Sequence, residues 1–262
     1  MEKGKPKKLS HFAPRASNDI IIGPRAILEA IAAEKSIDKI LISRELSNEQ
    51  TRQVAQEANN YQIPVQKVPV EKLTRLTRKI HQGMIALAAP ISFAHFEHEI
   101  EVAIESGFFP LVLMLDGVTD VRNFGAIARS AEALGAEIIV VPAKNAARIG
   151  EDAMKTSAGA LNHIKVAKTR HLKDVLLFLQ SYGYQVVACT EKGNQPIFQV
   201  NFERPTCIIM GAEETGIGSD LLRVSDVLAY IPMTGKIASL NVSTATTVVL
   251  YEAIRQKNMA LK

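Results

Sequence analysis

The chain has 262 residues, 47% of them hydrophobic, so it can bury a sizeable core and has room for two modest domains. Its net charge of +4 favours an anionic partner without defining one. No apolar run reaches the length of a membrane span, and the N-terminus has no apolar stretch of the secretory kind. We therefore expect a cytoplasmic protein with no membrane partner.

Residues 1–18 are predicted to be a disordered tail, because four lysines crowd the first eight positions. The tail either keeps the protein in solution or acts as a basic arm that touches phosphates. Two cysteines, Cys189 and Cys207, each lie in an apolar strand-like run, which is typical of free buried thiols in a reducing compartment. We expect no disulfide between them.

Residues 19–91 alternate between helical and strand patterns, which predicts a small α/β domain. The expected helices span 26–34, 48–60 and 70–79, and the expected strands span 39–43, 65–68 and 84–88. The next segment, 92–107, is aromatic and charged, and we interpret it as a linker running into a helix. His95 and His98 in this segment have a helical spacing that can bind a metal, but no further ligand is spaced nearby, so we predict no metal site.

Residues 108–262 form a second alternating series. Its strands are expected at 111–116, 137–141, 164–167, 185–189, 206–210 and 227–232, and its helices at 123–134, 150–158, 170–182, 219–224 and 241–257. This pattern predicts a mostly parallel sheet with helices on both faces. In such folds ligands bind where the chain leaves the carboxyl ends of the strands, so three turns of this domain are of special interest.

The first turn follows the strand 111–116 and leads into a helix with polar side chains at Asn123 and Arg129. Gly117 and Gly125 in this turn permit close backbone approach. An arginine on a helix is commonly a solvated surface residue, so Arg129 taken alone does not indicate a site. Its significance depends on the other two turns.

The second turn, 211–218, has glycines at 211, 216 and 218 and directly follows a strand. The spacing does not match the dinucleotide fingerprint, and two acidic residues sit inside the loop. Because Glu213 and Glu214 would repel a pyrophosphate, we expect a cationic or hydroxyl-bearing ligand. A helix start with Glu near its positive end is the structural alternative.

The third turn, 231–245, leads from a strand through a loop into the last predicted helix. Ser239 or Asn241 is a good N-cap for that helix, but capping does not explain Ser239, Asn241 and Ser243 together. Gly235-Lys236 is not a Walker-type loop, because the upstream glycine is missing.

Taken in order, the three turns resemble one known family. They read N-x-G-x-x-x-R from Asn123, G-x-E-x-x-G from Gly211, and S-L-N-x-S-x-A from Ser239. This set is similar to the SpoU (TrmH-type) RNA 2′-O-ribose methyltransferases over roughly residues 108–257. Each motif is weak alone, whereas their conjunction is specific. The front domain resembles, by size and pattern, the RNA-binding domain of the two-domain, RlmB-like branch.

The resemblance implies S-adenosylmethionine as methyl donor, a homodimer, and a deep C-terminal trefoil knot that forms the cofactor pocket. A knot could not have been expected from sequence rules, because knots are nearly absent from protein folds. Mapped onto this chain, the implied cofactor-binding residues are Thr190, Met210, Gly211, Gly216, Ile231, Met233 and Leu240. The apolar residues Ile231, Met233 and Leu240 would hold the adenine.

The resemblance also implies that Arg129 is the catalytic residue, which is sometimes described as a base. Removing a proton from an arginine at neutral pH costs on the order of 8 kcal/mol. We therefore interpret Arg129 as a fixed cation that grips an RNA phosphate and stabilises the developing 2′-oxyanion. Asn123 would orient the ribose or the arginine, Glu213 and Asn241 would hold polar atoms, and Ser239 would hydrogen-bond across the cleft.

The implied substrate is RNA, and the front domain favours a guanosine of large-subunit (23S) ribosomal RNA over transfer RNA. An inactive, knotted RNA-binding assembly factor is the non-enzymatic alternative. Basic residues on or just after the predicted helix 70–79, joined by Arg25, are either a solvated face or a surface that contacts phosphates. The RNA-binding candidates are Arg25, Arg75, Arg78 and Lys79.

Overall fold

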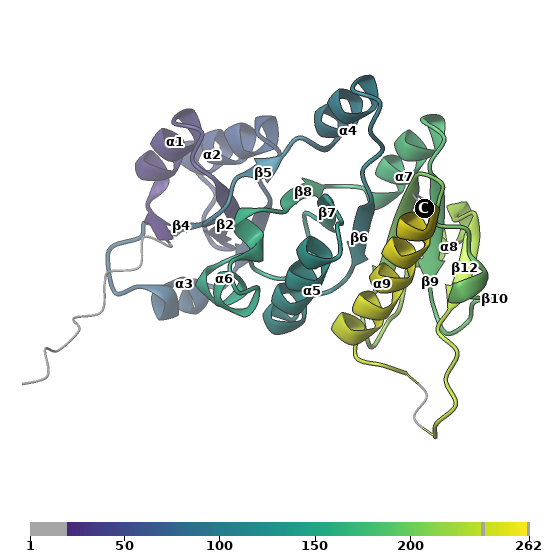
Figure 1. Cartoon of the computed structure of the whole chain (residues 1–262). Helices are drawn as coiled ribbons and strands as arrows, with labels where there is room; N and C mark the ends of the chain where they lie inside the picture. The colour runs from purple at the N-terminus through teal and green to yellow at the C-terminus, as the bar shows by residue number, and fades with distance from the viewer. Residues whose placement is uncertain (1–19, 237–238, 261–262) are drawn as a thin grey trace, which may run out of the picture.

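The computed structural model describes residues 20–236 and 239–260, which fold into two α/β units (Figure 1). The predicted tail 1–18 lies outside the described residues. The front unit consists of β1 (Ile20–Ile22), α1 (Pro24–Ala32), β2 (Ile37–Ser43), α2 (Glu49–Asn60), β3 (Val65–Val68), α3 (Val70–Leu76) and β4 (Met84–Ala88). Its sheet has the order β1-β4-β2-β3, in which only β2 and β3 are parallel. The sequence did not predict β1, which pairs with β4.

The second unit is built on an eight-stranded sheet with the order β10-β12-β9-β11-β6-β7-β8-β5. Its strands are β5 (Phe93–Ala94), β6 (Val112–Asp116), β7 (Ile138–Pro142), β8 (Lys165–Thr169), β9 (Gln185–Cys189), β10 (Gln195–Pro196), β11 (Thr206–Gly211) and β12 (Val227–Tyr230). Every pair of neighbouring strands is parallel. The predicted parallel sheet is thus confirmed.

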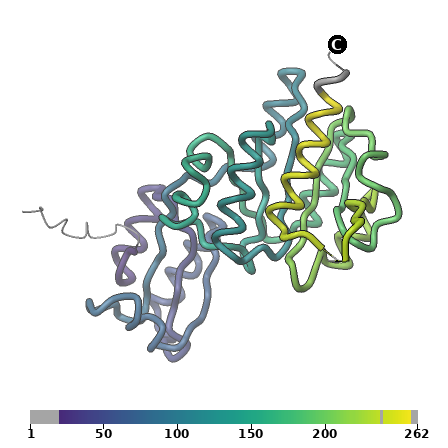
Figure 2. Tube along the Cα trace, turned by 60° about the horizontal axis from the view of Figure 1, so that its bottom comes forward, coloured from purple at the N-terminus to yellow at the C-terminus, as the bar shows by residue number. Residues whose placement is uncertain are grey.

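Helices cover both faces of this sheet, as predicted. The helices are α4 (Phe96–Glu105), α5 (Val121–Ala133), α6 (Glu151–Thr156), α7 (Leu172–Ser181), α8 (Ser219–Val224) and α9 (Val242–Ala260). One apolar core joins α5, α6 and α9 to one face, with Phe124 and Leu250 fully buried. A second core joins α4, α7 and α8 to the other face. Figure 2 shows α5 and α9 side by side, and the hydroxyls of Ser130 and Thr247 hydrogen-bond between them at 2.7 Å.

The segment 92–107, which we expected to be a linker, is instead part of the second unit. Phe93 and Ala94 form β5, which pairs with β8 at the edge of the sheet. The expected helix is present as α4, and its residues Phe96 and Ile100 are buried in the core. A strand of two residues has no alternating pattern to reveal it, which explains why the sequence indicated a linker.

The two units meet through a buried ion pair. Lys168 of β8 places its Nζ 2.6 Å from the carboxylate and 2.8 Å from the backbone carbonyl of Asp38 on β2. The side chain of Asp38 is only 1% exposed, and Lys168 also lies over the ring of Phe93, 4.1 Å from its centroid. Burial lowers the pKa of Lys168, while the charge of Asp38 opposes that shift. A second contact joins the guanidinium of Arg170 to the carbonyl of Asn59 at 2.9 Å.

No helix in the described part of the chain is long and apolar enough to cross a membrane.

Candidate active site

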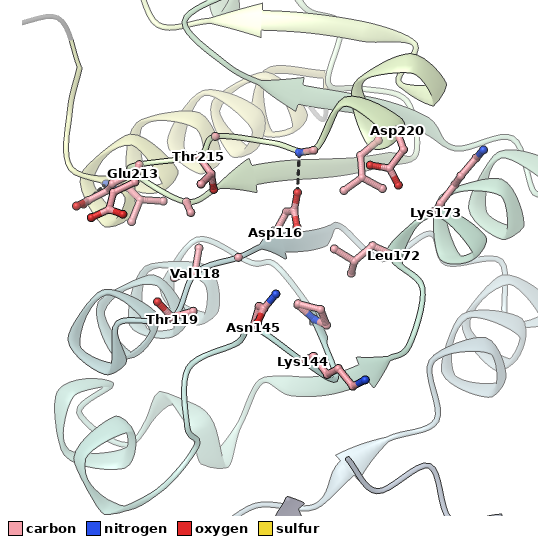
Figure 3. Close-up of a pocket in the computed structure, with 18 of the residues that line it drawn as sticks. Asp116, Val118, Thr119, Lys144, Asn145, Leu172, Lys173, Glu213, Thr215 and Asp220 are labelled. Carbon is pink, nitrogen blue, oxygen red and sulfur yellow. Dashed lines mark hydrogen bonds between the residues drawn. The ribbon is translucent and has the colours of Figure 1, made fainter. Parts of the chain in front are cut away.

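The three turns singled out in the sequence meet at the carboxyl edge of the large sheet. The first two follow β6 and β11, which are neighbours, and Asp116 at the end of β6 lies opposite Gly211 at the end of β11. The Asp116 carboxylate accepts a hydrogen bond of 2.8 Å from the backbone N–H of Gly218, the dashed line in Figure 3. This bond fixes the second turn against the first.

Three polar side chains from the three turns bind one another. The amide of Asn241 donates to Asn123 Oδ1 at 3.1 Å and also to Glu213 Oε1. The amide of Asn123 reaches the same Glu213 oxygen at 3.4 Å. The motif residues Asn123, Glu213 and Asn241 are therefore brought together although up to 118 positions separate them in the chain.

This network also starts the last helix. Asn241 Oδ1 accepts from the backbone N–H of Ser243 at 2.9 Å, which makes Asn241 the N-cap of α9, as its residue type predicts. Glu213 Oε1 accepts a hydrogen bond of 3.1 Å from the backbone N–H of Val242, the first residue of α9. A carboxylate at this end of a helix is electrostatically favourable. The helix-capping alternative is therefore correct for Asn241, and Glu213 lies at the start of α9 rather than of α8.

A cavity of about 510 Å³ opens beside this network. All seven residues predicted to bind a cofactor line it: Thr190, Met210, Gly211, Gly216, Ile231, Met233 and Leu240. Glu213, Ser239 and Asn241 line it as well. We call this space the cofactor cavity. Its volume is in the range of known small-molecule sites.

The lining of the cofactor cavity has a defined chemical character. Glu191 and Glu213 contribute carboxylates, and no lysine or arginine is among the described lining residues. The apolar part includes Ile217 and Ala245. The cavity thus suits a ligand with an apolar body and a positive charge, which is compatible with the cationic or hydroxyl-bearing ligand expected from the second turn. No motif marks Glu191, but its position just after β9, beside β11 and β12, could have revealed it.

Glycines let backbone segments at and near the cofactor cavity come close together. A Cβ on Gly211 would lie 2.3 Å from the carbonyl carbon of Gly216, and a Cβ on Gly193 would lie 2.6 Å from that of Ala229. Neither distance is compatible with a side chain, so these two positions require glycine. Gly125, which lines neither cavity, lets α5 approach α6, because a Cβ at this position would lie 2.6 Å from the Cβ of Thr156.

Both cysteines are free, and Cys189 lines the cofactor cavity. Burial raises the pKa of Cys189 to about 12 and raises that of Cys207 further. Both thiols are therefore protonated and unreactive at neutral pH. Among the described residues no group of three or more His, Cys, Asp or Glu side chains could hold a metal ion.

A second cavity, of about 900 Å³, adjoins the first along the carboxyl ends of β6, β7, β8 and β11 (Figure 3). We call it the groove. Asn123 and Glu213 line it, as do several residues that the sequence did not indicate: Lys144, Asn145, Arg170, His171 and Lys173. These residues follow β7 and β8, whose turns carry no motif.

Arg129 is not part of either cavity. It is exposed on α5, six residues after Asn123, which corresponds to about 9 Å along the helix axis. The RNA-binding candidates of the front unit also lie away from both cavities and are exposed: Arg25, Arg75, Arg78 and Lys79. Arg25 pairs with Glu29 at 3.1 Å. Because α3 ends at Leu76, Arg78 and Lys79 lie in the loop after it.

Comparison with known proteins agrees with this geometry. Residues 110–251 match the model of the SpoU rRNA Methylase family, and residues 20–94 match a domain described as RNA 2′-O ribose methyltransferase substrate binding. Fold, site and domain pairing together define an RNA 2′-O-ribose methyltransferase. The chain belongs to the SpoU rRNA Methylase family, which confirms the resemblance that the three motifs indicated.

Individual relatives span nearly the whole chain. A protein of Bacillus subtilis named for the TrmH family of tRNA/rRNA methyltransferases is 31% identical over 241 residues, 92% of this chain and 97% of its own. The AdoMet complex of the SpoU methyltransferase AviRb from Streptomyces viridochromogenes has a TM-score of 0.58 at 25% identity, covering 92% of this chain and 90% of AviRb. A solved RNA 2′-O ribose methyltransferase has a TM-score of 0.53 at 25% identity, with coverages of 91% and 88%.

Proposed function

We propose that this enzyme binds S-adenosylmethionine in the cofactor cavity and methylates the ribose 2′-hydroxyl of a guanosine in large-subunit (23S) ribosomal RNA, in the cytoplasm. The observation that carries the cofactor assignment is the lining of one cavity by the second and third motif turns and the loop after β9, with two carboxylates and no basic side chain among the described lining residues. S-adenosylmethionine has an apolar adenine and a net positive charge, which fits this lining. AviRb, which has the same fold, was crystallised with this cofactor.

The bound cofactor would supply an electrophilic methyl group, so this chain's residues have to place the ribose hydroxyl and accommodate one proton. Glu213 uses Oε1 for Asn123, Asn241 and Val242, and its Oε2 accepts no hydrogen bond from the described residues. We assign Oε2 to a hydroxyl of the substrate or to the positive end of the cofactor. The interlocked amides of Asn123 and Asn241 keep Glu213 in place. Ser239, exposed at the rim, would donate to the same ligand.

Arg129 would act as the fixed cation beside the phosphate of the target nucleotide, with the proton passing to that phosphate or to water. Within one chain it lies outside the cofactor cavity. This position supports a homodimer in which the Arg129 of one copy completes the site of the other. Mixing two inactive variants, Arg129→Ala and Gly211→Val, tests this arrangement. Heterodimers regain activity only if the arginine acts across the interface, so a mixture without activity would contradict it.

We also propose that the chain around the cofactor cavity forms the deep trefoil knot implied by the family. Two backbone bonds support this idea, because they hold the loop after β9 against β12. Thr190 N–H donates to the carbonyl of Ala229 at 2.8 Å, and Asn194 N–H donates to that of Leu228 at 2.9 Å. Such a loop gives the cofactor a wall made mainly of backbone.

The front unit would bind the RNA through Arg25, Arg75, Arg78 and Lys79. Its match to a substrate-binding domain supports binding of RNA, and the description of the matched family as rRNA methylases is the reason to favour ribosomal RNA. Transfer RNA is the second candidate because the Bacillus subtilis relative is named for both. The decisive experiment maps 2′-O-methyl groups on all stable RNAs with and without the gene. One missing guanosine methyl in 23S RNA is the expected result. A missing methyl in transfer RNA would reject the ribosomal target, and unchanged RNA would favour an inactive assembly factor.

A further inference from the structure

The groove described above has no role assigned by the motifs or by the family comparison. Four loops form it, after β6, β7, β8 and β11. Its residues from the β7 and β8 loops include Lys144 and Lys173, which are labelled in Figure 3, and Arg170. Its volume of about 900 Å³ exceeds that of the cofactor cavity. The space is therefore large enough for a ligand of nucleotide size.

One end of the groove adjoins the cofactor cavity, and the other end adjoins the front unit. At one end, Ala212, Glu213, Gly216 and Val242 line both the groove and the cofactor cavity. At the other end, Arg170 reaches the front unit by its hydrogen bond to the Asn59 carbonyl. The groove thus runs from the methyl-transfer site to the unit that matches a substrate-binding domain.

The charges along the groove are divided between its two sides. The β6 and β11 loops contribute the carboxylates of Asp116, Asp120, Glu213, Glu214 and Asp220, whereas the β7 and β8 loops contribute Lys144, Arg170, His171 and Lys173 beside a single carboxylate, Asp174. Asp116, Asp120 and Glu213 already accept hydrogen bonds from protein donors.

The two lysines of the basic side are available to bind a ligand. Lys144 and Lys173 are exposed, and neither has an ion pair or side-chain hydrogen bond with the described residues. A phosphate is repelled by the acidic side of the groove and attracted by the basic side. Hydroxyl and amino donors of a nucleotide suit the acidic side.

We propose that the groove holds the RNA strand next to the target nucleotide, with its phosphates against Lys144, Arg170 and Lys173 and its sugars and bases towards Asn123 and Glu213. This inference rests on the proposed function and adds a path for the substrate. The strand passes from the front unit, along β8 and β7, to the ribose at the cofactor cavity. Contacts of this kind carry affinity and position the strand without reading its sequence.

The test compares two double variants of the full-length chain. Lys144→Glu with Lys173→Glu reverses the basic side of the groove. The control, Arg204→Glu with Arg223→Glu, makes the same charge change at exposed residues that line neither cavity. Fluorescence anisotropy with a labelled single-stranded RNA of mixed sequence measures RNA affinity over a series of salt concentrations. Calorimetry with S-adenosylmethionine measures the cofactor site.

We expect the groove variant to bind the RNA about tenfold more weakly and its slope of log affinity against log salt to fall by about 1.4, since each single-strand phosphate contact contributes about 0.7. Cofactor affinity should not change in either variant. Equal RNA affinity and equal slopes in the groove and control variants would overturn the proposal. Wild-type protein that binds the RNA but methylates no RNA would instead contradict the proposed function, while the binding comparison stays interpretable.

Discussion

The sharpest prediction concerns the substitution Gly211→Ala in the wall of the cofactor cavity. The added methyl carbon would lie 2.3 Å from the carbonyl carbon of Gly216 and 2.5 Å from the nitrogen of Ile217. Carbon atoms in contact are about 3.5 Å apart, so the loop would have to move by about 1.2 Å. The atoms in the way are backbone atoms and cannot rotate aside.

Overpacking of this kind costs about 1–3 kcal/mol. The loop from Gly211 to Gly216 carries Glu213 and lines the cavity. The free protein can relieve the clash by shifting this loop, whereas binding has to return the loop to its place, so we expect the cost to fall on the bound state. At about 1.4 kcal/mol per factor of ten, the Kd for S-adenosylmethionine should rise about 5- to 150-fold. Isothermal titration calorimetry measures this change, and thermal melting in the absence of cofactor measures the effect on the fold.

The matched control is Gly235→Ala. Gly235 lies in the loop of the third turn, and no atom of the described residues lies within 4 Å of the position that its Cβ would take. This variant should bind the cofactor as the wild type does. If Gly211→Ala retained wild-type affinity, or if both variants lost affinity equally, the close approach of the two backbone segments would not be what shapes the cavity.

Two further predictions concern stability. Lys168→Met leaves the buried carboxylate of Asp38 with the longer pairing to Lys39, whose Nζ lies 3.9 Å away, and should lower the free energy of unfolding in urea by about 3 kcal/mol. An added Asp38→Leu should restore most of that loss. No recovery would mean that packing rather than charge joins the units. Burial raises the pKa of the Glu137 carboxyl above its ordinary value of 4.5. Between the ordinary and the raised pKa the native state binds more protons than the unfolded chain. The free energy of unfolding should therefore fall as the pH rises from the ordinary pKa to the raised one. Glu137→Gln should flatten this profile in thermal melting, and an unchanged slope would assign it to another group.

The sequence predicted the large sheet well because its strands are buried on both faces and appear as unbroken apolar runs, such as the one ending at Asp116. It also predicted the meeting of Asn123, Glu213 and Asn241, because each follows a strand that ends at the same edge. The two-residue β5 was missed, since pairing with β8 rather than a local pattern creates it. Lys144 and Lys173 were missed for a related reason, because only the order of the strands brings their loops beside the motif turns.

The position of Arg129 shows another limit of the sequence. Its spacing from Asn123 fixes its distance along α5 but not what it faces, because that depends on neighbours outside the helix. The seven residues assigned to the cofactor, which the family resemblance placed on three loops, line one cavity, and their role in binding the cofactor stays a prediction. Glu191, on one of those loops, needed the structure to show that its carboxylate faces the same space.

The short strand β5 has a consequence for how the enzyme can be divided. It is the outermost strand next to β8, and Lys168 of β8 is in turn covered by the front unit. A catalytic fragment that began at residue 108 would lose β5 and α4, and would leave the backbone of β8 and the apolar surface beneath Phe96 and Ile100 open to water. Bare strand edges pair with other chains, so such a fragment is expected to self-associate. We therefore expect a catalytic fragment that stays monomeric to begin ahead of Phe93, although the match to the methylase family starts at residue 110.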